Sequence, residues 1–385
     1  MLAGKGQLLR FGDCQWARVQ HKGVLLILTI IYAVLVLGAL IFFHELGHFA
    51  VARWFGMGVS RFSLGFGPVL CSFTRGKTEY ALSAVPLGGY VSLVGESDDA
   101  DLPQGFSPQE SFALRPAWQR LLVVAAGPIA NFILAWVVCW VLAIGYGQVI
   151  ALPEIGGIVA ESPAAKAGIQ AGDRVLAVDD VPIGTWAEMS DAIAASKGKS
   201  LTFLLQRGTE SLPVTLTPQL AKRKTIFGEE EEAWLAGVRS SGAVETLPLS
   251  FAESFPAANN RTWELIDLTW QGFVKLAQRV VPADQVGGPI MIAQMVGQSA
   301  EAGLAALLAL TALISVNLGI LNLLPVPILD GGQIVFCLIE MVIRRPINEK
   351  ARGIAMRIGF ALLMALMVFA TYNDIARIVK SWSIG

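Results

Sequence analysis

The chain has 385 residues, of which 54% are hydrophobic and only 15% charged, and its net charge is −1 at pH 7. Soluble proteins carry about 25% charged residues, so this composition argues against a soluble protein and indicates a membrane protein with several spans. A net charge so close to zero gives no support for a nucleic-acid partner. The four cysteines are scattered, without metal-ligand or disulfide spacing, and are expected to be packing residues.

Four apolar runs set the predicted membrane spans, because crossing a hydrocarbon core takes roughly 20 residues. The first run follows a basic N-terminal extension, residues 1–23, and together they resemble a signal peptide. We expect a retained span instead, since the run is longer than a signal core and leads directly into a histidine cluster. The fourth run is short and crosses only if Arg357 reaches the interface. The predicted segments are residues 24–55, 121–147, 303–343 and 354–376.

The segment between the first two spans, residues 56–120, is predicted to be β structure. The stretches "RFSLGFGPVL" and "EYALSAVPLGGYVSLVG" alternate apolar and polar positions and are punctuated by glycine, a pattern typical of short strands and hairpins. The run "GESDDADLPQG" behind them is expected to be a solvated loop. We therefore predict a β-hairpin region associated with the membrane.

The first span ends in the pattern H-E-x-x-H, formed by His44, Glu45 and His48. Positions i and i+4 share a helix face, so both imidazoles point at one place and suit a zinc ion, while Glu45 can act on water as a general base. Chance occurrence is the competing interpretation. Against it, the chain has only three histidines, and two of them lie here, at membrane depth, where ionisable side chains are costly and usually functional.

A catalytic zinc site usually has three protein ligands, and Asp330 is the best candidate for the third. It is the only charged residue between positions 301 and 340. Pro325 and Pro327 must break the helix ahead of it, and the two glycines behind it allow a tight turn that presents the carboxylate to a metal. The alternative is a helix-capping aspartate at the membrane surface.

Asn317 and Asn322 are costly in hydrocarbon unless they are paired. Their amides can hold the backbone of a substrate or support an oxyanion, or they can form hydrogen bonds between helices. For Asn317 both interpretations stay open, whereas the position of Asn322 near Asp330 favours a functional role.

The combination of "FFHELGHF" with the distant "NLLPVPILDGG" resembles the site-2 protease family of intramembrane zinc metalloproteases. The stretches "GFGPVL", "VPLGGYV", "AAGPIANF" and "GGPIMIAQ" agree, so the resemblance covers nearly the whole chain and is greatest to the bacterial regulator of sigma-E protease (RseP) type. The family implies that His44, His48 and Asp330 bind Zn²⁺ and that Glu45 is the general base. It also implies that Asn322, and less directly Asn317, contact the substrate backbone.

In that family, the hairpin corresponding to "PLGGYV" is thought to receive the substrate as an added strand, which implies substrate-binding roles for Gly88, Gly89 and Tyr90. Physical reasoning agrees, because a transmembrane helix must unwind before hydrolysis and an exposed strand edge can pair with the extended segment. The two glycines leave room for that approach. An ordinary hairpin turn is the alternative.

The polar region between the second and third spans contains "IGGIVAESPAAKAGIQAGDRVLAVDD", which resembles a circularly arranged PDZ domain of bacterial proteases. Residues 150–222 are assigned to it. The resemblance implies binding of an extended peptide or a C-terminus, and a structural spacer is the alternative. RseP-type proteins commonly carry two such domains, but only one is found here. Residues 223–300 are predicted to be a linker with amphipathic helices. The stretch 253–281 is expected to lie at the membrane surface or, equally, to pack on the PDZ domain.

The expected fold class is therefore a polytopic α-helical membrane protein of about four transmembrane helices, with a membrane-associated β-hairpin region and an inserted PDZ domain. Basic residues mark the cytoplasmic side. The loop 52–120 and the segment 344–357 are rich in them, whereas the N-terminal stretch argues the other way. We expect the active site near the cytoplasmic face of a bacterial inner membrane and the PDZ domain on the opposite side.

The predicted function is hydrolysis of peptide bonds within or near transmembrane segments. By resemblance, the substrates are single-span proteins such as an anti-sigma factor, in a sigma-E stress response, or remnant signal peptides. Two rivals are a transporter that uses His44, Glu45 and Asp330 as an ion relay, and a non-catalytic scaffold that binds peptides through its PDZ domain. The complete set of ligands and general base argues against the scaffold, because a scaffold does not need a general base.

Overall fold

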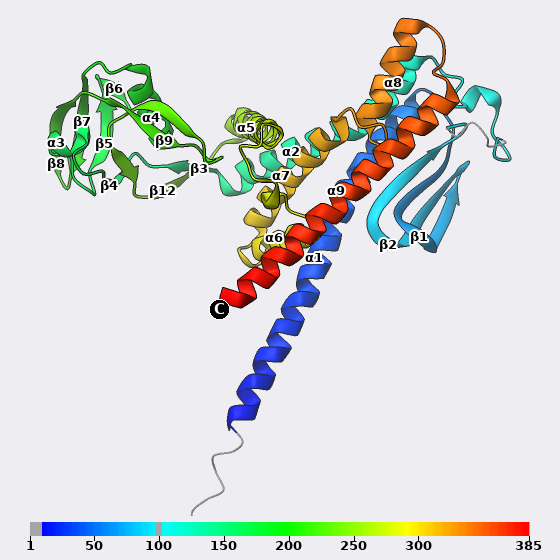
Figure 1. Cartoon of the computed structure of the whole chain (residues 1–385), viewed down its shortest axis with the longest axis horizontal. Coiled ribbons are helices and arrows are strands. Elements are labelled where there is room, and N and C mark those ends of the chain that lie inside the picture. Colours follow the sequence, from blue (N-terminus) through cyan, green and yellow to red (C-terminus); the bar gives the residue numbers. More distant parts are fainter. Residues whose placement is uncertain (1–9, 97–101, 385) are drawn as a thin grey trace, which may run out of the picture. The chain divides into compact units, whose positions relative to one another are not determined.

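The structure, a computed structural model shown in Figure 1, describes residues 10–96 and 102–384. Residues 1–9 of the predicted N-terminal extension, and residues 97–101 of the loop predicted at "GESDDADLPQG", lie outside the described residues. The chain divides into two compact units. One contains the residues up to 142, residues 258–271 and those from 282 onward, and the other contains residues 143–257 and 272–281.

Four helices of the described chain are long and apolar enough to cross a membrane. Many of their apolar side chains face outward, as expected where lipid replaces water: only 11% of the most apolar window of the last helix is buried inside the protein. The number of candidate membrane helices in the described chain therefore agrees with the prediction. The helices are α1 (Arg10–Trp54), α2 (Ala117–Tyr146), α7 (Leu304–Leu323) and α9 (Glu349–Ile384).

Three of these helices extend beyond the spans predicted for them, and α2 does so by four residues at its start. Helix α1 begins at Arg10 and includes much of the predicted extension, and α9 exceeds the predicted 354–376 at both ends. The physical reason is that an apolar run marks only the part of a helix in lipid, whereas the backbone hydrogen bonds continue through polar turns outside it.

The third predicted span, residues 303–343, consists of two helices. Helix α7 ends at Leu323, and the next helix, α8 (Asp330–Ile343), begins at Asp330. Pro325 and Pro327 lie in the break, where they have no backbone N–H to continue the helical hydrogen bonds. Asp330 is thereby placed at a helix N-terminus.

The predicted β-hairpin region is a sheet of four segments, because β1 (Val59–Arg75) and β2 (Thr78–Leu93) each pair twice. Residues 59–64 are central: they pair on one side with residues 79–82 and on the other with residues 89–93. The remaining half of β1 pairs with the first half of β2. Residues 89–93 therefore form an edge segment of the sheet.

The bend in β1 lies at "GFG". Gly65 and Gly67 have φ of 88° and 83°, values that residues with a Cβ rarely adopt. Beyond the bend, the side chains of Leu70 and Phe73 are about two-thirds exposed, at 67% and 65%. Exposed apolar side chains of this size are expected where a surface meets lipid, which agrees with a membrane-associated position for this half of the sheet.

The second unit is a small α+β fold. Its main sheet has the strand order β6-β5-β7-β8, and its core contains the fully buried Val175, Met189, Phe203 and Leu205. The elements are β3 (Gln148–Ala151), β4 (Ile155–Ile158), α3 (Pro163–Lys166), β5 (Arg174–Val178), β6 (Val181–Pro182), α4 (Trp186–Ala195), β7 (Leu201–Arg207), β8 (Glu210–Leu216), β9 (Gln219–Lys224), β10 (Glu230–Leu235), β11 (Val238–Ser240) and β12 (Val244–Leu247).

This unit continues beyond the predicted domain end at residue 222. That position falls inside the antiparallel hairpin β9–β10, and β11 and β12 pair with β4 and β3 at the start of the unit. The predicted linker 223–300 therefore begins with strands. Sequence periodicity did not predict these pairings, because the paired residues lie 80 to 99 positions apart in the chain and leave no local pattern.

A buried aspartate fixes the turn that leads into β5. Asp173 accepts hydrogen bonds from Nε and Nη2 of Arg207, at 2.8 and 2.7 Å, and from the Gln170 backbone N–H at 2.8 Å. The Arg207 guanidinium holds the pKa of the Asp173 carboxyl below its usual value. The paired charge explains how an aspartate that is 1% exposed is tolerated here.

The helices predicted in the linker are present as α5 (Phe251–Ala277) and α6 (Pro289–Glu301). Helix α6 packs against α1, where Gly297 lies against Thr29, and shares a core with α1 and α7 that includes Leu40, Val296 and Leu310. Two short 3₁₀ turns, η1 (Pro108–Glu110) and η2 (Ala283–Gln285), complete the described elements.

Candidate metal centre

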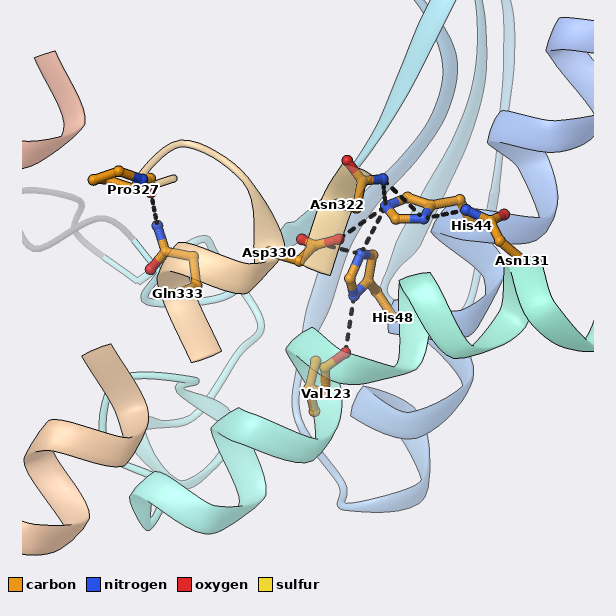
Figure 2. Close-up of polar contacts among 8 residues, drawn as sticks. All are labelled: His44, His48, Val123, Asn131, Asn322, Pro327, Asp330 and Gln333. Carbon is orange, nitrogen blue, oxygen red and sulfur yellow. Dashed lines mark hydrogen bonds and ion pairs between the residues drawn. The ribbon is translucent and has the colours of Figure 1, made fainter. Parts of the chain in front are cut away.

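His44, His48 and Asp330 converge from α1 and the first residue of α8 (Figure 2). Nε2 of His44 lies 3.3 Å from Nε2 of His48 and 3.2 Å from Oδ2 of Asp330. Nε2 of His48 lies 3.6 Å from Oδ1 of Asp330. One ligand atom from each residue lies within 4.8 Å of the other two, so the three side chains can hold a single metal ion.

The segment between α7 and α8 presents Asp330 by folding back on the first turn of α8. A Cβ on Gly331 would meet the carbonyl oxygen of Leu323, and a Cβ on Gly332 would lie 2.5 Å from Cα of Pro327. Neither glycine has a positive φ. They are needed for the space they leave, because any side chain would push the preceding segment away and carry Asp330 with it.

Two other glycines bring α1 and α2 together at the site. A Cβ on Gly47 would touch the backbone of Ala126, and a Cβ on Gly127 would overlap Nε2 of His48 and lie 2.9 Å from Cε1 of His44. Real Cβ atoms do not approach neighbours this closely. Helix α2 can therefore cross α1 at the histidine pair only where both helices lack side chains.

The tautomer of His48 follows from one hydrogen bond. Its Nδ1 lies 2.8 Å from the carbonyl oxygen of Val123 in α2 (Figure 2), and a carbonyl can only accept, so Nδ1 carries the proton. The lone pair of Nε2 then faces His44 and Asp330.

Two asparagine side chains surround His44. Nδ2 of Asn131 in α2 lies 3.0 Å from Nδ1 of the ring, and Nδ2 of Asn322 in α7 lies 3.4 Å from Nε2 (Figure 2). The structure therefore brings Asn322 to the site. Asn131 was not among the residues predicted there.

Glu45 lies between the histidines and the edge of the sheet. It lines a pocket of about 200 Å³ together with His44, His48 and Asp330, and with Gly89, Tyr90, Val91 and Leu93 of the edge segment. The backbone N–H of Val91 lies near the Glu45 carboxylate. A Cβ on Gly89 would lie 3.2 Å from Cγ of Glu45. The edge segment therefore forms one wall of the pocket.

The remaining predicted residues occupy different places. Tyr90 lines the pocket, stacks on Phe66 with ring centroids 6.1 Å apart, and accepts a hydrogen bond from Arg61 at 3.2 Å. Gly88 faces the Phe66 ring, which any Cβ would overlap. Asn317 accepts a 2.7 Å hydrogen bond from the Thr269 hydroxyl of α5, so it joins two helices, as in the second interpretation of its sequence position.

The donor set fits a zinc ion. Two imidazole nitrogens and one carboxylate are three typical protein ligands of catalytic zinc. Oδ2 of Asp330 is buried without a hydrogen-bond donor, and a buried, unsatisfied charged oxygen is strongly unfavourable unless a cation neutralises it. The nearest histidine nitrogen to Oδ2 is Nε2 of His44 at 3.2 Å, while Nε2 of His48 lies 3.6 Å from Oδ1. Each of these nitrogens would offer a lone pair to a metal held between the three side chains.

These features define a class: an integral membrane protein whose spans enclose a metal centre of the H-E-x-x-H type completed by a distant aspartate. The sequence signature described as peptidase family M50, which comprises the site-2 proteases, matches residues 32–366. The chain belongs to this family of zinc metalloproteases, which confirms the resemblance seen in its motifs and identifies Zn²⁺ as its cofactor.

The chain is similar to curated proteins over nearly their whole lengths. One from Agrobacterium fabrum is 38% identical and aligns over 90% of this chain and 95% of its own length. Others, from Mesorhizobium japonicum and Campylobacter jejuni, are 37% and 38% identical over 90% of this chain and over 98% and 93% of theirs. All three are named zinc metalloproteases. Among solved structures, the PDZ domain of an SdrC-like protein from Listeria monocytogenes covers 23% of this chain and 84% of its own, at 16% identity and a TM-score of 0.18.

Sequence reasoning missed the contribution of α2 to the site. Gly127 and Asn131 both contact the histidine pair, and both lie in "AAGPIANF", which served only as a mark of resemblance. A usable signal was present, because the two residues are four apart and therefore share a helix face. A small residue and a buried amide on one face of a membrane helix indicate close packing and a polar partner.

Proposed function

We propose that this chain is an intramembrane zinc endopeptidase that hydrolyses peptide bonds within or near the transmembrane segments of membrane proteins. The observation that carries the proposal is the convergence of His44, His48 and Asp330 with Glu45 in one pocket among the membrane-spanning helices. A transporter needs a path for its substrate and no fixed general base. A scaffold needs neither ligands nor base.

Each pocket residue has a distinct role in the proposed reaction. His44, His48 and Asp330 hold the zinc ion, which when bound supplies Lewis acidity and lowers the pKa of water in the pocket. Glu45 accepts a proton from the attacking water and delivers it to the leaving amine nitrogen as the C–N bond breaks. Asn322, whose amide lies beside His44, donates a hydrogen bond to a backbone carbonyl of the substrate.

The edge segment 89–93 receives the unwound substrate as an added strand. Three features support this: the segment has a partner strand on one side, it lines the pocket, and the backbone N–H of Val91 lies near Glu45. A substrate strand paired there lies directly beside the general base. Gly89 has no side chain to obstruct that approach, and Tyr90 and Gly88 hold the segment against Phe66.

Replacing Val91 with proline tests this strand addition, because proline removes the backbone N–H near Glu45 and is tolerated at sheet edges. We expect KM for a single-span substrate to rise about tenfold, the value of one hydrogen bond, with zinc content unchanged. Val91→Ala keeps the N–H and should retain a KM close to that of the unmodified protein. An unaltered KM in Val91→Pro would exclude pairing at this position.

Metal removal tests the proposal as a whole. Purified protein in detergent should cleave a single-span test substrate at a bond in or beside its transmembrane segment, stop when a chelator strips the metal, and recover when Zn²⁺ is added back. Cleavage products identified by mass spectrometry give the position of the bond. Cleavage that persists after complete metal removal would contradict the mechanism.

The cellular location and the orientation in the membrane are inferred from the sequence. We propose a bacterial inner-membrane location with the metal centre near the cytoplasmic face, since basic residues are concentrated in loop 52–120 and segment 344–357. The second unit, on the opposite side, acts as a PDZ domain that binds a peptide or a C-terminus. The substrates are single-span proteins of the anti-sigma-factor type, or remnant signal peptides.

A further inference from the structure

Asn131 is a completely buried polar residue of α2, with no exposed surface, beside a proposed zinc ligand. Its Nδ2 lies 3.0 Å from Nδ1 of His44, while its Oδ1 is buried without any hydrogen-bond partner. The backbone carbonyl of Asn131 accepts a 2.7 Å hydrogen bond from the Ser315 hydroxyl in α7. The position of the residue is thus anchored through its backbone, independently of what its side chain does.

The orientation of His44 decides which of its nitrogens must carry a proton. Nε2 faces His48 and Asp330, at 3.3 and 3.2 Å, so Nε2 provides the lone pair for the metal and Nδ1 carries the proton. That N–H needs an acceptor, because a buried donor without a partner costs about 1–3 kcal/mol. An amide nitrogen cannot accept, but an amide oxygen can.

A half-turn of the Asn131 amide about its Cβ–Cγ bond exchanges Oδ1 and Nδ2. Oδ1 then accepts from Nδ1–H of His44, and the oxygen that had no partner acquires one. His48 achieves the same result with the Val123 carbonyl. The two histidines thus have equivalent supports, one from the backbone of α2 and one from a side chain a little over two turns further along the same helix.

We propose that Asn131 is a positioning residue of the metal centre: its Oδ1 accepts the Nδ1 proton of His44 and so holds the tautomer and ring plane that direct Nε2 to zinc. The inference rests on the proposed function, since it assumes that His44 is a ligand. Hydrogen bonds of this kind typically account for 10- to 100-fold in metal affinity.

A purely structural role for Asn131, joining α2 to its neighbours, predicts something different. It would make any substitution that preserves packing harmless to zinc binding, and it would make the backbone contact with Ser315 as important as the side chain. Zinc affinity, measured by competition with a chelator of known affinity, separates the two roles. The visible spectrum of the Co²⁺-substituted protein reports ligand geometry as a second readout.

The experiment compares full-length Asn131→Leu, Asn131→Asp and Ser315→Ala with the unmodified protein. Leucine has a similar volume but no acceptor, and should weaken zinc binding by 10- to 100-fold and alter the Co²⁺ spectrum. Aspartate keeps the acceptor and should bind zinc at least as tightly as the unmodified protein. Ser315→Ala removes only the backbone contact and should leave the affinity within a few-fold. If Asn131→Leu does not purify, Asn131→Ala provides the same comparison.

The outcomes distinguish this inference from the proposed function. Zinc affinity unchanged in the leucine or alanine variant, or lost equally in the aspartate variant, would overturn the positioning role while the protease assignment stands. Failure of the unmodified protein to bind zinc would instead overturn the proposed function itself.

Discussion

Glu45→Gln should lower kcat by about 10³-fold while leaving the zinc content of the purified protein unchanged. Glutamine has nearly the same shape but cannot take a proton from water, and general base catalysis by a positioned side chain typically contributes 10²- to 10⁴-fold. Glu45 is not one of the three residues whose ligand atoms converge, so removing its charge does not remove a ligand. Zinc quantification paired with cleavage of a single-span substrate measures both quantities on one preparation.

Glu45→Asp is the informative companion variant. It keeps the carboxylate but withdraws it by one methylene, away from the Val91 N–H and the pocket. Its rate should fall between those of the unmodified protein and Glu45→Gln, because positioning errors of about 1 Å already cost roughly 100-fold. If Glu45→Gln turned over substrate normally, Glu45 would not be the base, and the ion-relay or scaffold interpretations would return.

The metal ligands could be predicted because polar groups are costly to bury at membrane depth and are therefore rare there unless they have a function. In a chain with few charged residues, His44, Glu45 and His48 at the end of an apolar run have few explanations besides function. Asp330 stands alone in a long uncharged stretch, behind two prolines that break a helix. The helix periodicity placed the histidines on one face, and elimination identified the aspartate, which the structure brings within 3.2 Å of His44.

The strand pairing and the interhelical contact around the site could not be predicted in the same way. The double pairing of β1 and β2 depends on the bend at "GFG", and strand alternation predicts the segments without their order. The resemblance implied a substrate-receiving strand edge at "PLGGYV", but the sequence did not show that residues 89–93 pair with residues 59–64 and line the pocket beside Glu45. Similarly, the interhelical bond of Asn317 to Thr269 depends on where α5 lies, which neither residue reveals.

Gly127→Ala should weaken zinc binding by at least about 100-fold and abolish detectable cleavage. A methyl group at this position overlaps Nε2 of His48 and approaches Cε1 of His44 to 2.9 Å. The His48 ring cannot swing away freely, since Nδ1 is held by the Val123 carbonyl at 2.8 Å. The overlap can therefore be removed only by moving the His48 ring or the whole of α2, and either movement displaces a ligand nitrogen. Losses of this size are expected when ligand geometry is disturbed.

Gly145→Ala on the same helix is the matched control, because a Cβ there meets nothing within 4 Å. Alanine favours a helix by up to about 1 kcal/mol over glycine, so Gly145→Ala should keep or increase the stability of α2, whereas in Gly127→Ala the overlap with the His48 ring costs more than this gain. The thermal unfolding temperature without metal should therefore fall in Gly127→Ala and hold or rise in Gly145→Ala, and only Gly127→Ala should lose zinc affinity. Equal zinc affinity in the two variants would mean that α2 does not enclose the histidine pair, and the metal centre would lose the element that confines His44 and His48 to one geometry.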